Sequence, residues 1–323
     1  MYPQVRLRRL RKNANTRALA CETRLAVSDL IYPLFVVPGN KIKREISSMP
    51  GQFLYSLDQL PAFIDQIAQT GIKTLLLFGQ TEVKDPRGES ACADQAVVCE
   101  AVKLIKEKYP EFVLMTDVCL CSYTDHGHCG PIVEGYVDND ATLEVLAKVA
   151  VAHAQAGADF VAPSGMMDGM VAAIREALDD QGFVNVGILS YAVKYASSFY
   201  GPFRDAADST PQEGDRKSYQ MNPANSREAL REAELDVLEG ADLLMVKPGG
   251  PYLDIIAGLH QNFNIPVVAY QVSGEYSMIK AAGAKGWVDE QAVVLESLLA
   301  LKRAGAQAII TYFALDAAKW LVI

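Results

Sequence analysis

Two lysines in this 323-residue chain lie at or near the ends of apolar runs typical of buried strands. Lys247 directly follows the run 243–246, and Lys194 lies just past a run at 184–190. Burial and a second nearby cation both lower the pKa of an amine, which yields the neutral form that attacks a ketone. The pair predicts carbinolamine or Schiff-base chemistry. A lone strand-end lysine would be explained by a side chain that extends to the solvated rim.

Three clustered cysteines form a second group that could do chemistry. Cys119, Cys121 and Cys129 have the spacing C-x-C-x7-C, which is not the paired C-x2-C of a zinc finger. Three thiolates suffice for a catalytic zinc that keeps one position open, whereas the alternative is three ordinary buried cysteines. No apolar export signal is recognisable, so thiolate or metal chemistry is favoured over disulfides. The other cysteines are scattered: Cys21, Cys92 and Cys99.

Polar side chains also follow other predicted strands, and two arginines lie on the longest connection, 195–225. Arg204 and Arg216 are suited to bidentate capture of a carboxylate when such a connection closes as a lid, although solvated loop charge would also explain them. The hydroxyls of Ser273 and Tyr312 could donate hydrogen bonds to a second carboxylate, although a strand-end tyrosine is often only a packing residue. The strand-end residues are Asp117, Ser164, Ser273 and Tyr312.

Eight short aliphatic runs alternate with amphipathic segments, a pattern typical of βαβ units and a parallel sheet. Eight is the number of strands that closes a (β/α)8 barrel, where the carboxyl ends of all strands meet at one face. The sequence therefore predicts an α/β fold of the TIM (β/α)8-barrel type, with helices at 57–69, 91–108, 141–156, 171–181, 226–239 and 290–303. The expected strands are 31–37, 73–78, 112–118, 159–162, 184–190, 242–246, 266–271 and 307–312.

A recurring join supports one repetitive domain at 31–323. Three predicted helices end in Gly-Ala, at Gly157, Gly240 and Gly305, and lead directly into a strand. A doubly wound open sheet is the alternative, but Pro38-Gly39-Asn40 after the first strand does not make its G-x-G-x-x-G phosphate loop. Residues 1–30 show no strong period and are expected to form an extended arm that contacts other subunits.

Charge narrows the classes of partner. The net charge of -9 and the pI near 5.1 give no basic footprint for nucleic acid. A basic stretch in the arm could be a nucleic-acid or targeting segment, but such arms more often pack on protein. No apolar run approaches a membrane span of roughly 18 residues, so we expect a cytoplasmic protein. The basic residues are Arg6, Arg8, Arg9, Arg11 and Lys12.

Several segments together resemble the delta-aminolevulinic acid dehydratase family, also called porphobilinogen synthase. The most specific are the cysteine loop at 117–130, the segment KYASSFYGPFR at 194–204 and the segment MVKP at 245–248. The resemblance covers nearly the whole chain, from 8–11 and 29–36 to 312–314. It implies a lyase on a TIM barrel that condenses two molecules of 5-aminolevulinic acid to porphobilinogen in tetrapyrrole (heme) biosynthesis.

The resemblance also implies residue roles. Lys247 would form a Schiff base with the first substrate, whose carboxylate would meet Ser273 and Tyr312, and Lys194 would bind the second, whose carboxylate would meet Arg204 and Arg216. Some family members have aspartates in place of these cysteines and dispense with zinc. This chain has Cys119, Cys121 and Cys129, which implies the zinc-requiring kind.

The resemblance further implies an allosteric magnesium at Glu232, with Arg227 or Arg231 nearby, and a homo-octamer in which the arm embraces a neighbouring barrel. From its own sequence context Glu232 looks like part of an ordinary solvated helix face. Two rival functions remain: a lysine aldolase, which needs one lysine and no thiolate metal, and a structural zinc or interaction protein, which predicts a closed four-ligand site.

Overall fold

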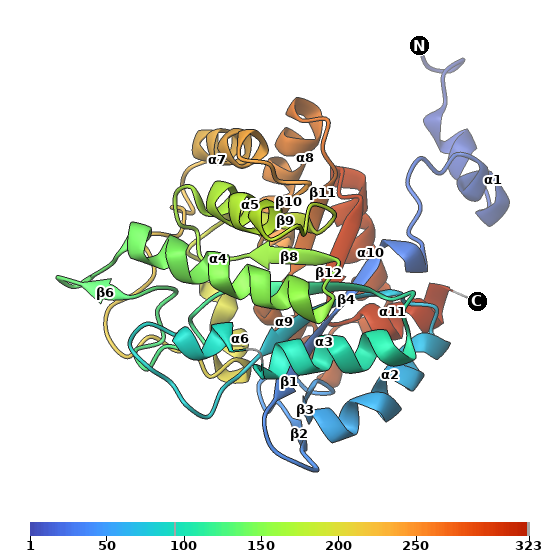
Figure 1. Ribbon diagram of the computed structural model, residues 1–323. Helices are drawn as coiled ribbons and strands as arrows, with labels where there is room; N and C mark the ends of the chain where they lie inside the picture. The colour runs from blue at the N-terminus through green and yellow to red at the C-terminus, as the bar shows by residue number, and fades with distance from the viewer. Residues whose placement is uncertain (94, 322–323) are drawn as a thin grey trace.

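A closed barrel of eight parallel strands forms the centre of the computed structural model, which describes residues 1–93 and 95–321 (Figure 1). The strands follow one another in chain order around the barrel, and the last pairs with the first, Leu30 opposite Ile309. The predicted fold class is confirmed. The barrel strands are β1 (Leu30–Val37), β4 (Thr74–Gly79), β5 (Val113–Val118), β8 (Phe160–Pro163), β9 (Gly187–Lys194), β10 (Leu243–Lys247), β11 (Val267–Gln271) and β12 (Ala308–Thr311).

Seven strands begin within one residue of the predicted start, and β9 is the exception. The run 184–190 was predicted as a strand, but β9 covers Gly187–Lys194. Val184 lies in the turn before the strand and is 63% exposed, so its β-branched side chain was misleading. The prediction that Lys194 follows the strand is therefore wrong. Lys194 is the last residue of β9, as Lys247 is of β10.

Helices surround the barrel on the outside (Figure 1). The six predicted segments are present, with η3 (Leu57–Gln59) and η4 (Glu89–Cys92) as separate short 3-10 turns. Three further helices, α8, α9 and α11, were not predicted. The helices of this layer are α2 (Leu60–Gln69), α3 (Val97–Lys108), α4 (Asn139–Ala156), α5 (Met170–Asp180), α7 (Arg227–Leu238), α8 (Leu253–Asn262), α9 (Ser273–Ala284), α10 (Glu290–Ala304) and α11 (Ala314–Leu321).

The Gly-Ala joins have a second role beyond ending helices. Gly157, Gly240 and Gly305 have φ of 105°, 104° and 120°, which glycine adopts without strain. The residue after each Gly-Ala is polar. Its side chain accepts one hydrogen bond from a backbone N–H at the start of the preceding barrel strand. These bonds run from Leu114 N to Asp159, from Ile188 N to Asp242, and from Val267 N to Gln307, at 2.7 to 2.8 Å. The repeated motif thus fixes neighbouring strands at the amino end of the barrel.

The remaining short elements lie at the edges. β2 (Lys43–Glu45) and β3 (Phe53–Ser56) form a hairpin attached to β1, and β6 (Ile132–Val133) pairs with β7 (Tyr136–Val137). The connection 195–225 contains η5 (Ser198–Tyr200) and α6 (Gly201–Ala206), and η6 (Gly250–Tyr252) follows β10.

The amino-terminal arm lies apart from the barrel (Figure 1). It is not simply extended, since it contains η1 (Leu7–Arg11) and α1 (Ala14–Leu19), and η2 (Val27–Asp29) leads into β1. No residue from 1 to 29 is buried, so the arm adds little to the core of its own barrel. Among the described residues, no helix has both the length and the apolar character needed to cross a bilayer.

Candidate active site

Lys194 and Lys247 lie side by side at the carboxyl end of the barrel. They are the final residues of β9 and β10 and are paired in register. Both side chains are buried, with exposed fractions of 5% and 4%. Lys194 Nζ donates a hydrogen bond to Ser164 O at 2.5 Å. The barrel thus holds two amines next to each other in a site shielded from water.

Aromatic rings enclose the Lys247 amine. Nζ lies 4.4 Å from the ring centre of Tyr270, 4.8 Å from Phe203, 5.0 Å from Tyr191 and 5.4 Å from Tyr200. Burial, followed by the charge of Lys194, lowers the pKa of Lys247 to about 7, although Asp117 acts in the opposite direction. An amine with this pKa is substantially neutral at physiological pH, as attack on a carbonyl requires.

Asp117 and Ser164 form the polar wall beside the lysines. Burial raises the pKa of Asp117 to about 6, while Lys247, Lys194 and a hydrogen bond with Ser164 oppose that shift. A carboxyl group with such a pKa can hold or release a proton near neutral pH. Both predicted strand-end residues therefore lie with the lysine pair.

The three clustered cysteines are brought together. The Sγ atoms of Cys119, Cys121 and Cys129 all lie within 4.8 Å of one another, and all three side chains are buried. Cys119 Sγ and Cys121 Sγ are 3.4 Å apart, and no cysteine forms a disulfide. A compact set of three soft thiol donors fits a zinc ion that keeps a fourth position for another ligand.

The loop that carries the cysteines is fixed by close packing. A Cβ on Gly130 would lie 2.0 Å from Thr142 Oγ1 on α4, so only glycine allows the loop to approach this closely. The His128 ring contacts Tyr219 Oη at 3.1 Å and Glu213 O at 2.9 Å. His128 therefore joins the cysteine loop to the connection 195–225.

Residues 195–225, here called the lid, cover the mouth of the barrel. The Phe203 ring packs against Phe35 and Phe78 at centroid distances of 5.8 and 5.2 Å. Phe203 N donates a hydrogen bond to Ser273 Oγ at 2.9 Å. The Phe203 ring therefore lies over Lys247, and its backbone joins the lid to the start of α9.

The two predicted lid arginines are close enough to influence each other. Burial, followed by the charge of Arg216, lowers the pKa of Arg204. Arg216 Nη2 donates to Gly127 O at 2.9 Å and to Ser209 O at 2.6 Å. The Nε atoms of both arginines are buried and have no hydrogen-bond partner among the residues that the structure describes. Two like charges with unused donors are suited to an anion such as a carboxylate.

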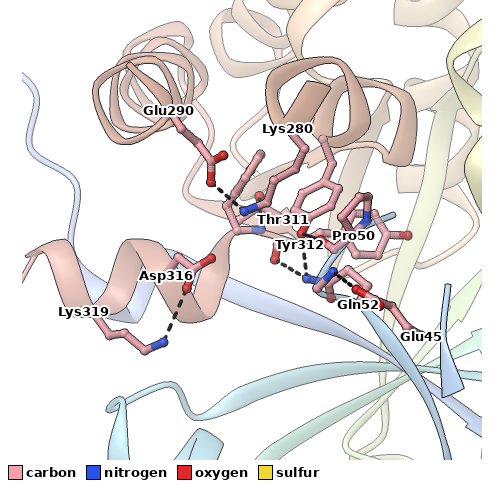
Figure 2. Close-up of polar contacts among 12 residues, drawn as sticks. Glu45, Pro50, Gln52, Lys280, Glu290, Thr311, Tyr312, Asp316 and Lys319 are labelled. Carbon is pink, nitrogen blue, oxygen red and sulfur yellow. Dashed lines mark hydrogen bonds and ion pairs between the residues drawn. The ribbon is translucent and has the colours of Figure 1, made fainter. Parts of the chain in front are cut away.

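Ser273 and Tyr312 lie on the other side of Lys247. Ser273 is the first residue of α9, and Tyr312 directly follows β12. Tyr312 Oη is 2.9 Å from Oη of Tyr270, one of the rings around Lys247. Gln52 Nε2 donates to the backbone oxygen of Tyr312 at 3.1 Å (Figure 2). These contacts place two hydroxyls on the β11 and β12 side of the site.

Glu232 lies away from this cluster, on α7 outside the barrel. It lines a cavity of about 390 Å³ together with Arg231 and several acidic residues. Burial, followed by Asp168 and Glu228, raises the pKa of Glu232. The structure therefore puts Glu232 in an acidic hollow, separate from the lysines and cysteines.

Some site residues could not be identified from the sequence alone. Phe203, Tyr191 and Tyr270 look like ordinary packing residues until the barrel closes and turns them toward Lys247. Glu275 was also missed, although a glutamate three residues into a segment that follows a strand is a known signal of a helix start. That signal marks α9 and its first residue, Ser273.

The fold and the site define a (β/α)8-barrel enzyme with paired buried lysines and a three-cysteine cluster able to hold a metal. Residues 4–320 match the family model described as delta-aminolevulinic acid dehydratase. The chain belongs to this family of lyase-type dehydratases, the porphobilinogen synthases, so the resemblance drawn from its motifs is confirmed.

Individual relatives agree over nearly the full length. Delta-aminolevulinic acid dehydratases from Synechocystis sp. and Bacillus subtilis are 55% and 56% identical and cover 99% and 98% of this chain, and 99% and 98% of their own. The Toxoplasma gondii enzyme, solved with its reaction product porphobilinogen, has a TM-score of 0.97 at 48% identity, covering 99% of this chain and 92% of its own. A Stenotrophomonas maltophilia dihydropteroate synthase, with 10% identity and a TM-score of 0.52 over 91% of each chain, shares the fold alone.

Proposed function

We infer that this chain condenses two molecules of 5-aminolevulinic acid to porphobilinogen, and we propose that both ketones react as Schiff bases with Lys247 and Lys194. The observation that carries this mechanism is the register pairing of the two buried lysines, with the pKa of Lys247 lowered to about 7. Each Nζ adds to a ketone carbon, and the carbinolamine loses water to give an imine. One C–C and one C–N bond then form, both lysines are released, and two waters leave in total.

The carboxylates of the two substrates would bind on opposite sides of the lysine pair. Ser273 and Tyr312 would hold the carboxylate of the molecule on Lys247, because both hydroxyls lie on its β11 and β12 side. Arg204 and Arg216 would hold the carboxylate of the molecule on Lys194, since each has a buried Nε that finds no partner within the described part of the chain. Fixing both ends of each substrate lowers the entropic cost of bringing the reacting carbons together.

Proton transfer would fall to Asp117. Asp117 has a pKa near 6 and contacts Ser164, whose backbone oxygen binds the Lys194 amine. A carboxyl group in this position can take up a proton from substrate and return it to a leaving hydroxyl. Cys119, Cys121 and Cys129 would hold zinc, which when bound would supply Lewis-acid polarisation of a substrate oxygen or a template for its amine.

A lysine aldolase or a structural zinc protein accounts for less of the site. An aldolase gives no role to the second lysine or the thiols. A structural zinc site would need a fourth protein ligand, and the cluster among the described residues contains three candidates. An enzyme that condenses two ketone substrates gives a role to both lysines and to the three thiols.

Regulation, assembly and location are proposed on separate grounds. Glu232 is a candidate ligand of an allosteric magnesium, since it lies among other carboxylates. The exposed arm is a candidate contact within a homo-octamer. A cytoplasmic location agrees with six cysteines that are all free thiols.

The test is borohydride trapping with 5-aminolevulinic acid, followed by mass mapping of the modified peptides. Reduction of the imine should leave a stable adduct on Lys247 and a second on Lys194. Lys247→Met and Lys194→Met should each remove one adduct, and either should reduce turnover by at least about 10³-fold, because each removes a covalent step. Absence of any lysine adduct in zinc-replete protein would overturn the mechanism.

A further inference from the structure

Glu275 connects two backbone segments that carry proposed site residues. It lies in the first turn of α9. Its Oε1 accepts a hydrogen bond from Gly250 N at 3.0 Å, and its Oε2 accepts one from Val272 N at 2.8 Å. Burial raises the pKa of Glu275 to about 7, against the effect of its backbone hydrogen bonds. Sheltering a carboxyl group is costly, and this one contacts the turn after β10 as well as the start of its own helix.

The two segments joined by Glu275 begin at the ends of adjacent strands. Gly250 follows Lys247 by three residues, and Val272 directly precedes Ser273. Gly250 also provides the space for the contact, because a Cβ there would lie 2.3 Å from Glu275 Oε1. The carboxylate therefore acts as a bridge between the turn after β10 and the junction of β11 with α9.

This bridge joins the two segments whose residues are proposed to hold the ends of one substrate. Under the proposed function, Lys247 binds the ketone and Ser273 the carboxylate of the same molecule. We propose that Glu275 is a positioning residue that fixes Lys247 relative to Ser273 and so makes the site selective for the chain length of 5-aminolevulinic acid. The inference rests on the proposed function, and it gives a role to a residue that does not touch substrate.

A purely structural role for Glu275 predicts a different result. As a helix cap alone, the carboxylate would stabilise α9, and its loss would lower stability and all adduct rates together. As a bridge, its loss would reduce discrimination between substrates that differ in length. Selectivity therefore separates the two roles.

The experiment compares borohydride-trapping rates at Lys247 with 5-aminolevulinic acid and with 6-amino-5-oxohexanoic acid, which is longer by one methylene. One methylene is commonly worth about tenfold or more in selectivity. In Glu275→Gln an amide NH₂ must face one of the two backbone N–H groups. This should cut the rate with 5-aminolevulinic acid by about 10- to 100-fold, the range that misplaced groups produce, and reduce the preference for it by about tenfold. The adduct on Lys194 should form at a nearly unchanged rate.

Gly250→Ala provides an independent variant, because its methyl group would displace the same carboxylate oxygen without changing any charge. It should reproduce the loss of selectivity. The matched control is Glu290→Gln. Glu290 lies on α10, and its carboxylate pairs at 2.6 Å with Lys280 on α9 (Figure 2). Its replacement should leave selectivity intact.

Equal slowing with both substrates in the two bridge variants, or a loss of thermal stability with selectivity unchanged, would overturn the role of Glu275. Failure of the wild-type protein to form any adduct would instead refute the Schiff-base mechanism itself. The two failures are therefore distinguishable within one set of measurements.

Discussion

Lys247 owes its low pKa mainly to its enclosure and only secondarily to Lys194. Four aromatic rings within 5.4 Å of Nζ exclude water that would otherwise stabilise the ammonium form. Their faces attract a cation, yet that attraction is weaker than the hydration it replaces. The reactivity proposed for Lys247 thus follows from where its strand ends.

The rate of adduct formation at Lys247 should therefore depend on pH. The pKa is lowered to about 7, so the neutral amine is lost as the pH falls below that value. Single-turnover trapping should slow about tenfold per pH unit below 7 and level off above it. Lys194→Met removes a neighbouring positive charge, which should raise the pKa of Lys247 and move the fall in trapping rate to higher pH. A fall at the same pH in the variant would show that Lys194 does not act on Lys247.

At this scale the sequence pointed to the groups that are proposed to react, but not to their surroundings. Lys247 and Cys129 were recognisable because a lysine after a buried run and clustered thiols are costly without a role. Phe203 and Glu275 were not, because an aromatic ring or a glutamate is common in loops and helix starts. Only the three-dimensional structure brings Phe203 within 4.8 Å of Lys247 Nζ.

Among the elements, strand positions were predicted well because alternation with helices and the Gly-Ala joins are local signals. The error at β9 arose because the turn before this strand contains the β-branched residue Val184. Valine favours strands by its side chain alone, so its presence in a turn could not be distinguished from a strand start. α9 was missed because Gly274 and Gly283 interrupt its helical pattern. Gly274 is required there by a close approach, as its Cβ would lie 2.5 Å from Phe199 O of the lid.

The contact between the cysteine loop and α4 makes a prediction about metal binding. In Gly130→Ala, the new methyl group would lie 2.0 Å from Thr142 Oγ1 and should push the adjoining Cys129 out of place. Overpacking of this kind costs about 1–3 kcal/mol, which corresponds to zinc binding about tenfold weaker or more. Zinc competition titration would measure the change.

Gly258→Ala is the matched control for this substitution. An added methyl group there meets nothing closer than Leu230 Cδ2 at 3.8 Å, and the site lies on α8, away from the thiols. Its zinc affinity should equal that of the wild type. Equal affinity in Gly130→Ala as well would show that the loop tolerates displacement.

For the whole molecule, the arm should matter for assembly and not for folding of the barrel. Residues 1–29 contain no buried side chain, so deletion of residues 2–20 should leave the midpoint of thermal unfolding of the barrel essentially unchanged. The mass of the assembly, measured by light scattering after size-exclusion chromatography, should fall. An unchanged mass would show that the oligomer does not depend on contacts made by the arm.

The closed lid has a consequence for the time course of catalysis. Phe203 lies over Lys247, and the same segment is attached by its backbone to Ser273 and by Asp208 to Lys84, an ion pair of 2.7 Å. A substrate must wait for these contacts to break before it can enter. The observed rate constant for substrate binding should consequently rise with substrate concentration only to a plateau, and that plateau equals the rate at which the lid opens. Above that concentration, additional substrate would not increase the rate at which the first covalent bond forms.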